Sequence, residues 1–328
     1  MVDYLGITIL LGSFILLLIL RTPISFALLA SAILTSFYLK VPLMSVAVQM
    51  VKGIHSFSLL AIPFFILAGE IMGAGGISRR IIEFTNVLVG RVRGGLAQVN
   101  ILASMFFGGI SGSAIADVSS IGALLIPMMK DSGYDTDYAV DVTITSACQG
   151  LIILPAIITD YFAVSAGGVS VGQLFLGGML PGVLLGMALM IISYVIAVKR
   201  GYPKGAKISF KEAIKIASSA ILGLLTAVII IGGVIGGIFT ATESAAVACL
   251  YAFIVTFFIY REIPLSKMDE ILLNALRTLA TVLALLACCN AFGWFLAYLK
   301  IPALITGALL GVSNNKIVVL LLINLLLL

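Results

Sequence analysis

Apolar stretches long enough to cross a lipid bilayer recur along the whole chain. A membrane-spanning helix needs about 20 consecutive, mostly apolar residues. Such stretches lie near Tyr4–Leu20, Pro23–Leu39, Leu59–Met72, Tyr138–Ala166, Val171–Val198, Ser218–Ile235, Thr242–Ile259 and Leu279–Leu299. Hydrophobic residues make up 62% of the chain and charged residues only 10%, whereas about 25% of the residues of a soluble domain are charged. The sequence therefore predicts an all-α, polytopic membrane protein.

The distribution of basic residues predicts the orientation of the chain. The loop KRGYPKGAKISFKEAIK, residues 199–215, contains six lysines and arginines, and short cytoplasmic loops are enriched in these residues. If this loop is cytoplasmic, counting spans in both directions places fifteen of the nineteen basic residues inside, provided that Gly94–Met129 enters and leaves on one face. The amino terminus is then extracytoplasmic. The net charge of +5 thus reflects membrane topology and not an affinity for nucleic acid.

The segment Gly94–Met129 has a polar, glycine-rich centre, FFGGISGSAIADVSSIG, between two apolar flanks. Each flank is too short to cross a bilayer at about 1.5 Å per residue, so the segment predicts a re-entrant helical hairpin. Irregular backbone inside a membrane is tolerated only where it is buried in protein or lines a watery cavity. Alternatively, the glycines are small-residue contacts between closely packed helices. That alternative leaves Ser111, Ser113 and Asp117 unexplained.

Two parts of the chain resemble each other at an offset of 222 residues. VPLMSVAVQMVKGIHSFSLLAIP begins at Val41 and IPLSKMDEILLNALRTLATVLAL begins at Ile263, and each has a proline-leucine start, an amphipathic stretch and a span. By the predicted topology the two copies are inverted. Inverted repeats around a site at the bilayer midplane are the architecture of alternating-access transporters. The sequence stops where a second hairpin is expected to start, so we expect half of the binding site to lie outside it.

Three segments carry a resemblance to a known family. AIPFFILAGEIMGAGGISRRIIEF, LASMFFGGISGSAIADVSSIGALLIPMM and GGIFTATESAAVACLYA resemble the large membrane (M) subunit of tripartite ATP-independent periplasmic (TRAP) transporters, of the ion transporter superfamily. The resemblance runs from end to end, and because family members are longer it implies that a C-terminal part is missing. It implies a secondary active transporter, not an enzyme, for sodium-coupled uptake of an organic acid anion such as a dicarboxylate or sialic acid.

The resemblance also implies partners and a location. The partners are a small membrane (Q) subunit, a periplasmic substrate-binding protein that delivers the organic acid, and the lipid bilayer. The location is the bacterial inner membrane, with a periplasmic amino terminus.

The fold that the resemblance implies is an inverted-repeat, elevator-type transporter with re-entrant hairpins and interrupted helices. On this basis we assign scaffold helices and a cytoplasmic arm helix to residues 1–93, and the first hairpin with an interrupted helix to residues 94–170. Residues 171–316 hold a connecting helix, the basic loop and the scaffold helices of the second repeat, and residues 317–328 begin the second hairpin. Within the first part, Ser78–Gly95 has the composition of an interfacial helix along the cytoplasmic face.

The predicted sodium site follows from helix ends that meet at the midplane. Such ends offer backbone carbonyls to a cation and positive N-termini to an anion. We expect the Na⁺ ligands at the hairpin tip and near the break of the following helix: Ser111, Gly112, Ser113, Thr145, Ser146 and Gly150. We expect the substrate contacts to be Ser111, Ser113, Gln149 and Pro155. The chain departs from the family at the break, where GLIILPAI keeps a single proline. No other metal is expected.

Other polar residues allow two interpretations. Asp117 either adds charge to the site or accepts local hydrogen bonds, and we favour the second because a bare carboxylate repels an anionic substrate. Residues 240–243, TATE, match a helix start with capping residues, with a role in the site as the alternative. Glu70 is expected to be solvated or paired with Arg79 or Arg80.

Rival functions remain at this stage. An intramembrane hydrolase needs a nucleophile and a base, yet the sequence has no His-Glu-x-x-His motif, and its only histidine, His55, is expected in an outer segment. A passive anion channel would use the same half-helices without sodium coupling. A related sodium/carboxylate symporter would work without a binding protein.

Overall fold

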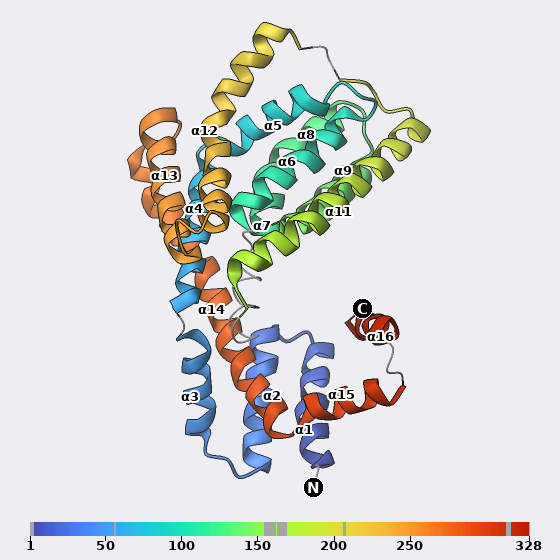
Figure 1. Cartoon of the computed structure of the whole chain (residues 1–328), viewed down its shortest axis with the longest axis vertical. Helices are drawn as coiled ribbons and strands as arrows, with labels where there is room; N and C mark the ends of the chain where they lie inside the picture. Colours follow the sequence, from blue (N-terminus) through green and yellow to red (C-terminus); the bar gives the residue numbers. More distant parts are fainter. Residues whose placement is uncertain are drawn as a thin grey trace. The chain divides into compact units, whose positions relative to one another are not determined.

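The computed structural model describes residues 3–55, 57–153, 162, 169–205, 208–312 and 316–327. These residues form helices, with one isolated antiparallel bridge between Arg93 and Lys204 (Figure 1). The α-helices are α1 (Tyr4–Ile19), α2 (Ile24–Tyr38), α3 (Leu43–Ile54), α4 (Ala61–Ala74), α5 (Ile77–Val89), α6 (Gly95–Ser111), α7 (Ala114–Asp117), α8 (Ala123–Asp131), α9 (Thr136–Gly150), α11 (Val171–Arg200), α12 (Phe210–Ile235), α13 (Ala241–Ile254), α14 (Met268–Tyr298), α15 (Ile301–Val312) and α16 (Lys316–Leu327). Short 3₁₀ helices are η1 (Phe57–Leu60) and η4 (Leu265–Lys267), and π-helical turns are η2 (Val118–Gly122) and η3 (Val255–Tyr260).

Several helices have the length and apolar character of membrane spans. Within the described residues, these are Gly172–Arg200, Phe210–Ile235, Ala241–Tyr260 and Leu265–Tyr298. The bent pair of α4 and α5 makes a fifth if it counts as one broken span. Shorter apolar helices include α1 and α2. The predicted all-α, polytopic membrane protein is therefore confirmed.

The chain divides into two compact units, each with its own core. The first contains Met1–Ser56 and Ala280–Leu328. Its core joins α1, α2 and α3 to the C-terminal part of α14, around Leu10, Phe292 and Phe295. The side-chain amide of Asn290 donates a 2.7 Å hydrogen bond to the carbonyl of Gln49 and so ties α14 to α3.

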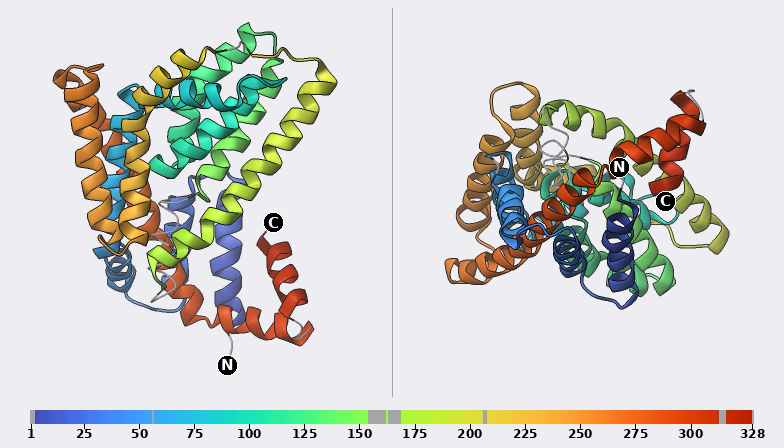
Figure 2. Two further views of the ribbon diagram at one scale, coloured as in Figure 1. Left: turned by 45° about the horizontal axis from the view of Figure 1, so that its top comes forward. Right: turned by 90° about the horizontal axis from the view of Figure 1, so that it is seen from below.

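The second unit contains Phe57–Leu279. Here α4 packs against α13, and α6 packs against both α5 and α9. Phe65, Phe107 and Ile121 are fully buried in its core. Figure 2 shows α11 running alongside α6 and α9, so the hairpin region is flanked by one long apolar helix.

A sharp bend separates α4 from α5. The two helices are bent by 71° across a short break, where Gly76 adopts a left-handed φ of 71°. Helix α5 has 13 residues, buries Ile77 and Ile81, and leaves Arg79 exposed. Its length and amphipathic character agree with the interfacial helix expected at Ser78–Gly95, and its position in a membrane stays a prediction.

The two repeat-like segments differ in helix continuity. The first forms separate helices, α3 and α4, whereas the second forms one helix, α14, with a 3₁₀ turn before it. Gly53 and Pro63 weaken a continuous helix in the first copy, and α14 has no glycine or proline before Gly293. The assignment of the four sequence ranges to scaffold and transport roles stays a prediction.

Candidate functional site

The predicted reversal of the chain lies between α6 and α7. Helix α6 ends at Gly112, which has φ 60° and ψ 15°. Ser113 is extended and caps the next helix, with its hydroxyl accepting a 3.3 Å hydrogen bond from the amide of Ala116. The chain returns through α7, η2 and α8, and these elements pack against α6. This stretch is therefore a helical hairpin with its tip at Gly112–Ser113.

The glycines of the hairpin have separate physical roles. Gly112 occupies a left-handed conformation that residues with a side chain rarely adopt. Gly108 serves packing instead, because a Cβ added there would lie 2.3 Å from the Cα of Gly150 on α9. The packing interpretation is thus confirmed for Gly108, and the need for a turn explains Gly112.

The serines of the tip line a small cavity. Its volume is about 20 Å³, enough for one water-sized group. The cavity is lined by Ile66, Gly69, Glu70, Ser111, Ser113, Ala116 and Thr278. Apart from the backbone, its polar groups are hydroxyls and one carboxylate, all of them hard oxygen donors.

A wider polar pocket adjoins the tip cavity. It has a volume of about 300 Å³ and shares Gly69, Glu70 and Ala116 with the tip cavity. Its other lining residues include Ser119, Ser120, Lys267, Glu270 and Asn274. Glu70 therefore lies at the junction between the tip and a larger polar space.

The expected pairing of Glu70 with a nearby arginine is wrong. Arg79 pairs with Glu83 at 3.2 Å, one turn along α5. Arg80 pairs with Glu262 at 2.6 Å and stacks over a tyrosine ring of η3. The bend between α4 and α5 directs both arginines to other partners, and the Glu70 carboxylate faces the cavities instead.

A second polar cluster lies in the seam between α6 and α9. The amide of Asn100 donates to the hydroxyl of Thr143 at 2.7 Å. The hydroxyls of Ser104 and Ser146 are 3.3 Å apart, and the Ser146 hydroxyl is also 3.3 Å from the side-chain oxygen of Asn100. All four side chains are buried. The predicted ligand Ser146 therefore belongs to this seam.

Asp117 lies one turn past the tip and is 1% exposed. Neither of its carboxylate oxygens meets hydrogen-bond geometry with a partner in the described part of the chain, although the Ser104 hydroxyl faces it. A charged carboxylate that is buried without partners is costly. The two interpretations of Asp117, local hydrogen bonds and charge in the site, therefore both stay predictions.

The remaining predicted site residues are dispersed. Thr145 is exposed, donates to the Asp141 carbonyl at 2.7 Å and lines a separate pocket of about 680 Å³. Gln149 is buried and donates to the Ile101 carbonyl at 2.7 Å, while its side-chain oxygen lacks a partner among the described residues. Gly150 lies against Gly108. Pro155 falls outside the described residues.

Of the predicted site residues, Ser111, Gly112 and Ser113 therefore lie at the tip. Thr145 lines a different pocket. Sequence reasoning missed Asn100, Ser104 and Thr143. The spacing of the first two was a usable signal, because Asn100, Ser104 and Gly108 recur every four residues and so share one face of α6.

The capping interpretation of residues 240–243 is confirmed. The backbone amide of Thr240 donates to the Glu243 carboxylate at 2.8 Å, and the Glu243 amide donates to the Thr240 hydroxyl at 3.3 Å. This reciprocal capping box begins α13.

Comparison with known proteins gives consistent matches. The family model described as "Tripartite ATP-independent periplasmic transporter, DctM component" matches residues 11–328. The chain is 40% identical over 325 residues to the uncharacterised protein YgiK of Salmonella typhimurium, covering 98% of this chain and 74% of that protein. It is 43% identical over 282 residues to the sialic acid TRAP transporter large permease protein SiaM of Vibrio cholerae, covering 86% and 66%. It is 37% identical over 284 residues to the C4-dicarboxylate TRAP transporter large permease protein DctM of Pseudomonas aeruginosa, covering 87% and 66%. The aligned region therefore spans about two thirds to three quarters of each of these proteins.

Proposed function

Because the chain belongs to the family of DctM components of tripartite ATP-independent periplasmic transporters, we propose that it forms the membrane path for sodium-coupled uptake of an organic acid anion. Relatives are named for sialic acid, C4-dicarboxylates and 2,3-diketo-L-gulonate. The observation that carries the proposal is the interrupted hairpin, whose Ser111 and Ser113 line a water-sized cavity with Glu70.

The donor set of the tip suits Na⁺ as a co-transported ion. The cavity offers the hydroxyls of Ser111, Ser113 and Thr278 and the carboxylate of Glu70. Hard cations prefer oxygen ligands of this kind. The last turn of α6 adds carbonyl oxygens that have no partner within the helix. The size of the cavity, about 20 Å³, supports a single small ion.

Electrostatics supply a reason for coupling. The Glu70 carboxylate at the cavity makes the tip region negative in the absence of a cation. An organic acid anion is repelled by this carboxylate at close range. A bound Na⁺ offsets that charge, so the anion binds favourably only after the cation. This order of binding couples the downhill movement of sodium to uptake of the acid.

The proposed partners are a small membrane subunit and a periplasmic substrate-binding protein. Large permeases of this family work with both, and the binding protein would deliver the acid to the extracytoplasmic side. The proposed location is the bacterial inner membrane, with the amino terminus in the periplasm, as the basic loops predict.

The test is uptake of radiolabelled carboxylic acids by the complete transporter in proteoliposomes. We expect accumulation of at least one acid only with an inward sodium gradient and with the binding protein present. Equilibration of the acid without sodium would identify a passive anion channel. Sodium-driven uptake that persists without the binding protein would identify a symporter of the related type.

A further inference from the structure

We propose that this protein binds an anionic phospholipid where the connection between α5 and α6 meets the end of α11. The headgroup is held by Arg91, Arg93 and Lys204, and part of one acyl chain lies in the apolar groove beside them. This site is separate from the hairpin tip, and the proposal does not depend on the transported substrate.

The backbone holds two basic segments side by side at this place. Arg93 and Lys204 form the isolated antiparallel bridge. The backbone amide of Gly94 donates a 3.0 Å hydrogen bond to the carbonyl of Pro203. Segments more than a hundred residues apart in the sequence therefore contribute cationic side chains to one small surface.

These cationic side chains lack acidic partners in the part of the chain that the structure describes. Arg91, Arg93 and Lys204 are all exposed, and the ion pairs found there involve other arginines. Neighbouring cations repel one another, and an anion placed between them removes that repulsion. A phosphate group fits this surface because guanidinium groups bind its oxygens in a bidentate manner.

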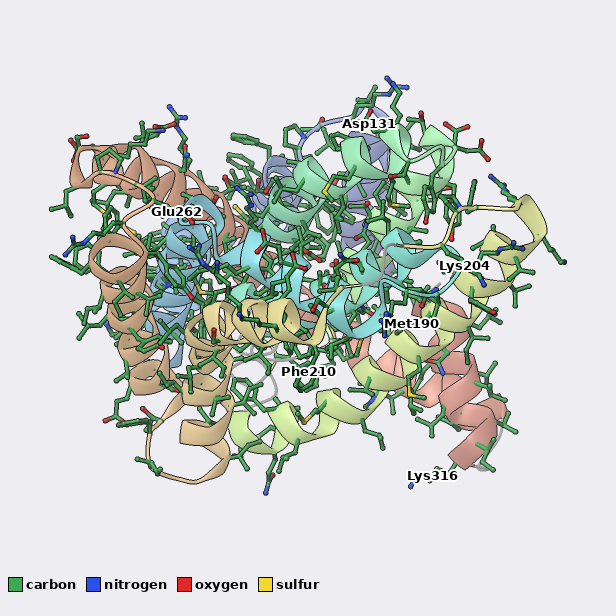
Figure 3. The ribbon with its side chains drawn as sticks, turned by 90° about the horizontal axis from the view of Figure 1, so that it is seen from above. Asp131, Met190, Lys204, Phe210, Glu262 and Lys316 are labelled. Carbon is green, nitrogen blue, oxygen red and sulfur yellow. The ribbon has the colours of Figure 1, made fainter. Side chains whose placement is uncertain are left out.

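An apolar groove begins at the same connection. Its volume is about 270 Å³, and it is lined by Val89, Val92, Gln98, Met190, Ile191 and Tyr194. Val92 lies between the two arginines in sequence, so the groove and the cationic surface share one edge. The side-chain amide of Gln98, one of the lining residues, donates a 2.9 Å hydrogen bond to the Met190 carbonyl. Met190 and Lys204 are labelled on the same side of the molecule in Figure 3.

The depth of these features favours a phospholipid over a soluble anion. Helix α11 is a membrane-span candidate that ends at Arg200, and the groove occupies its last third. The cationic surface follows directly at the polar end of that span. Basic pockets of this kind at the membrane surface bind anionic lipid headgroups. A free phosphate would contact the cations but leave the groove empty, with Ile191 63% exposed.

The test is lipid binding to the detergent-solubilised chain, measured by native mass spectrometry. Dioleoylphosphatidylglycerol and dioleoylphosphatidylcholine are titrated separately, because they share acyl chains and differ in headgroup charge. We expect the anionic lipid to bind at least about tenfold more tightly. The triple variant Arg91→Gln/Arg93→Gln/Lys204→Gln should lose that preference.

Matched control variants distinguish lipid binding at this site from non-specific binding to basic or apolar surface elsewhere on the protein. Lys130→Gln/Lys211→Gln/Lys215→Gln removes the same charge from exposed positions elsewhere and should keep the preference. Ile191→Ala should weaken binding of the anionic lipid. Ile192→Ala, at a neighbouring residue that is 56% exposed but faces another pocket, should not.

Three results would overturn the proposal: equal affinity for the two lipids, equal behaviour of the two triple variants, or full displacement of the lipid by inorganic phosphate. The last result would indicate a site for a free anion. Circular dichroism and size-exclusion chromatography check that the variants fold. If the first triple variant does not, Lys204→Gln gives the same test with a smaller expected effect, since the backbone bridge does not require its side chain.

Discussion

Two adjacent residues determine the geometry of the hairpin tip. Gly112 places the backbone in the left-handed region, and Ser113 returns it to an extended conformation and caps α7. As a result the hydroxyls of Ser111 and Ser113 line one cavity with Glu70. A helix that continued through this point would bury its carbonyls in its own hydrogen bonds and offer no oxygen to an ion.

The conformation of Gly112 predicts a selective loss of stability on substitution. Gly112→Ala forces a residue with a Cβ into the left-handed region, which costs about 1–2 kcal/mol. Gly177→Ala is the matched control, because Gly177 lies within α11 and an added Cβ would meet no atom within 4 Å. Thermal unfolding of the detergent-solubilised chain should show a lower midpoint for the first variant and an unchanged or raised midpoint for the second. Equal midpoints would contradict the importance of the turn.

The position of Glu70 predicts a role in sodium affinity. Glu70→Gln keeps the shape of the side chain but removes a negative charge beside the tip cavity. The sodium concentration for half-maximal uptake by the complete transporter should rise by about threefold or more. Glu83→Gln serves as control, because Glu83 forms only an exposed pair with Arg79 on α5. Normal sodium dependence of the Glu70 variant would contradict the prediction and would mean that this carboxylate does not contribute to sodium binding.

At the scale of elements, the hairpin and the capped start of α13 were predictable, because each is encoded in a short local pattern. The polar cluster between α6 and α9 was not found, since its members are paired only by tertiary packing. The pairing of Glu70 with Arg79 or Arg80, one of its two expected states, was wrong for a similar reason. Its nearest arginines in sequence lie beyond the 71° bend between α4 and α5, which places them with Glu83 and Glu262.

The start of α9 is joined to the end of α11 by a pH-dependent contact. The Asp135 carboxylate accepts hydrogen bonds from the Tyr202 hydroxyl and from Arg200, each at 2.7 Å. These bonds lower the pKa of Asp135, the Tyr202 hydrogen bond being the largest cause. A lowered pKa in the folded state stabilises the protein above the unfolded pKa, and this contribution is lost as the pH falls through the folded value.

The resulting prediction concerns the pH dependence of unfolding. Between neutral pH and pH of about 3, the wild-type chain should lose more thermal stability than Asp135→Asn. The difference should be small, because exposed pairs contribute little. Asp137→Asn makes the same charge change two residues away, without those hydrogen bonds, and should follow the wild type. Parallel curves for wild type and Asp135→Asn would contradict the contact.

At the scale of the whole molecule, composition alone predicted the membrane class. Hydrophobic residues make up 62% of the chain, which is well above the share in soluble domains. The resemblance of three segments to the TRAP large subunit is confirmed by a match over residues 11–328. The two compact units were not predicted. Their division falls inside α14, at Leu279 and Ala280, where a continuous helix gives no break in the sequence pattern. Scaffold and transport roles stay predictions.

The central claim is that the hairpin tip binds the coupling sodium ion. Its most direct test is the sodium dependence of uptake by the complete transporter carrying Ser111→Ala or Ser113→Ala, with Ser218→Ala as the control for loss of an exposed hydroxyl. Each tip variant should raise the sodium concentration for half-maximal uptake by about fivefold, the effect of losing one oxygen ligand worth about 1 kcal/mol. The control should match the wild type. Unchanged sodium dependence in both tip variants, with normal expression, would contradict the claim and leave the tip as a packing feature.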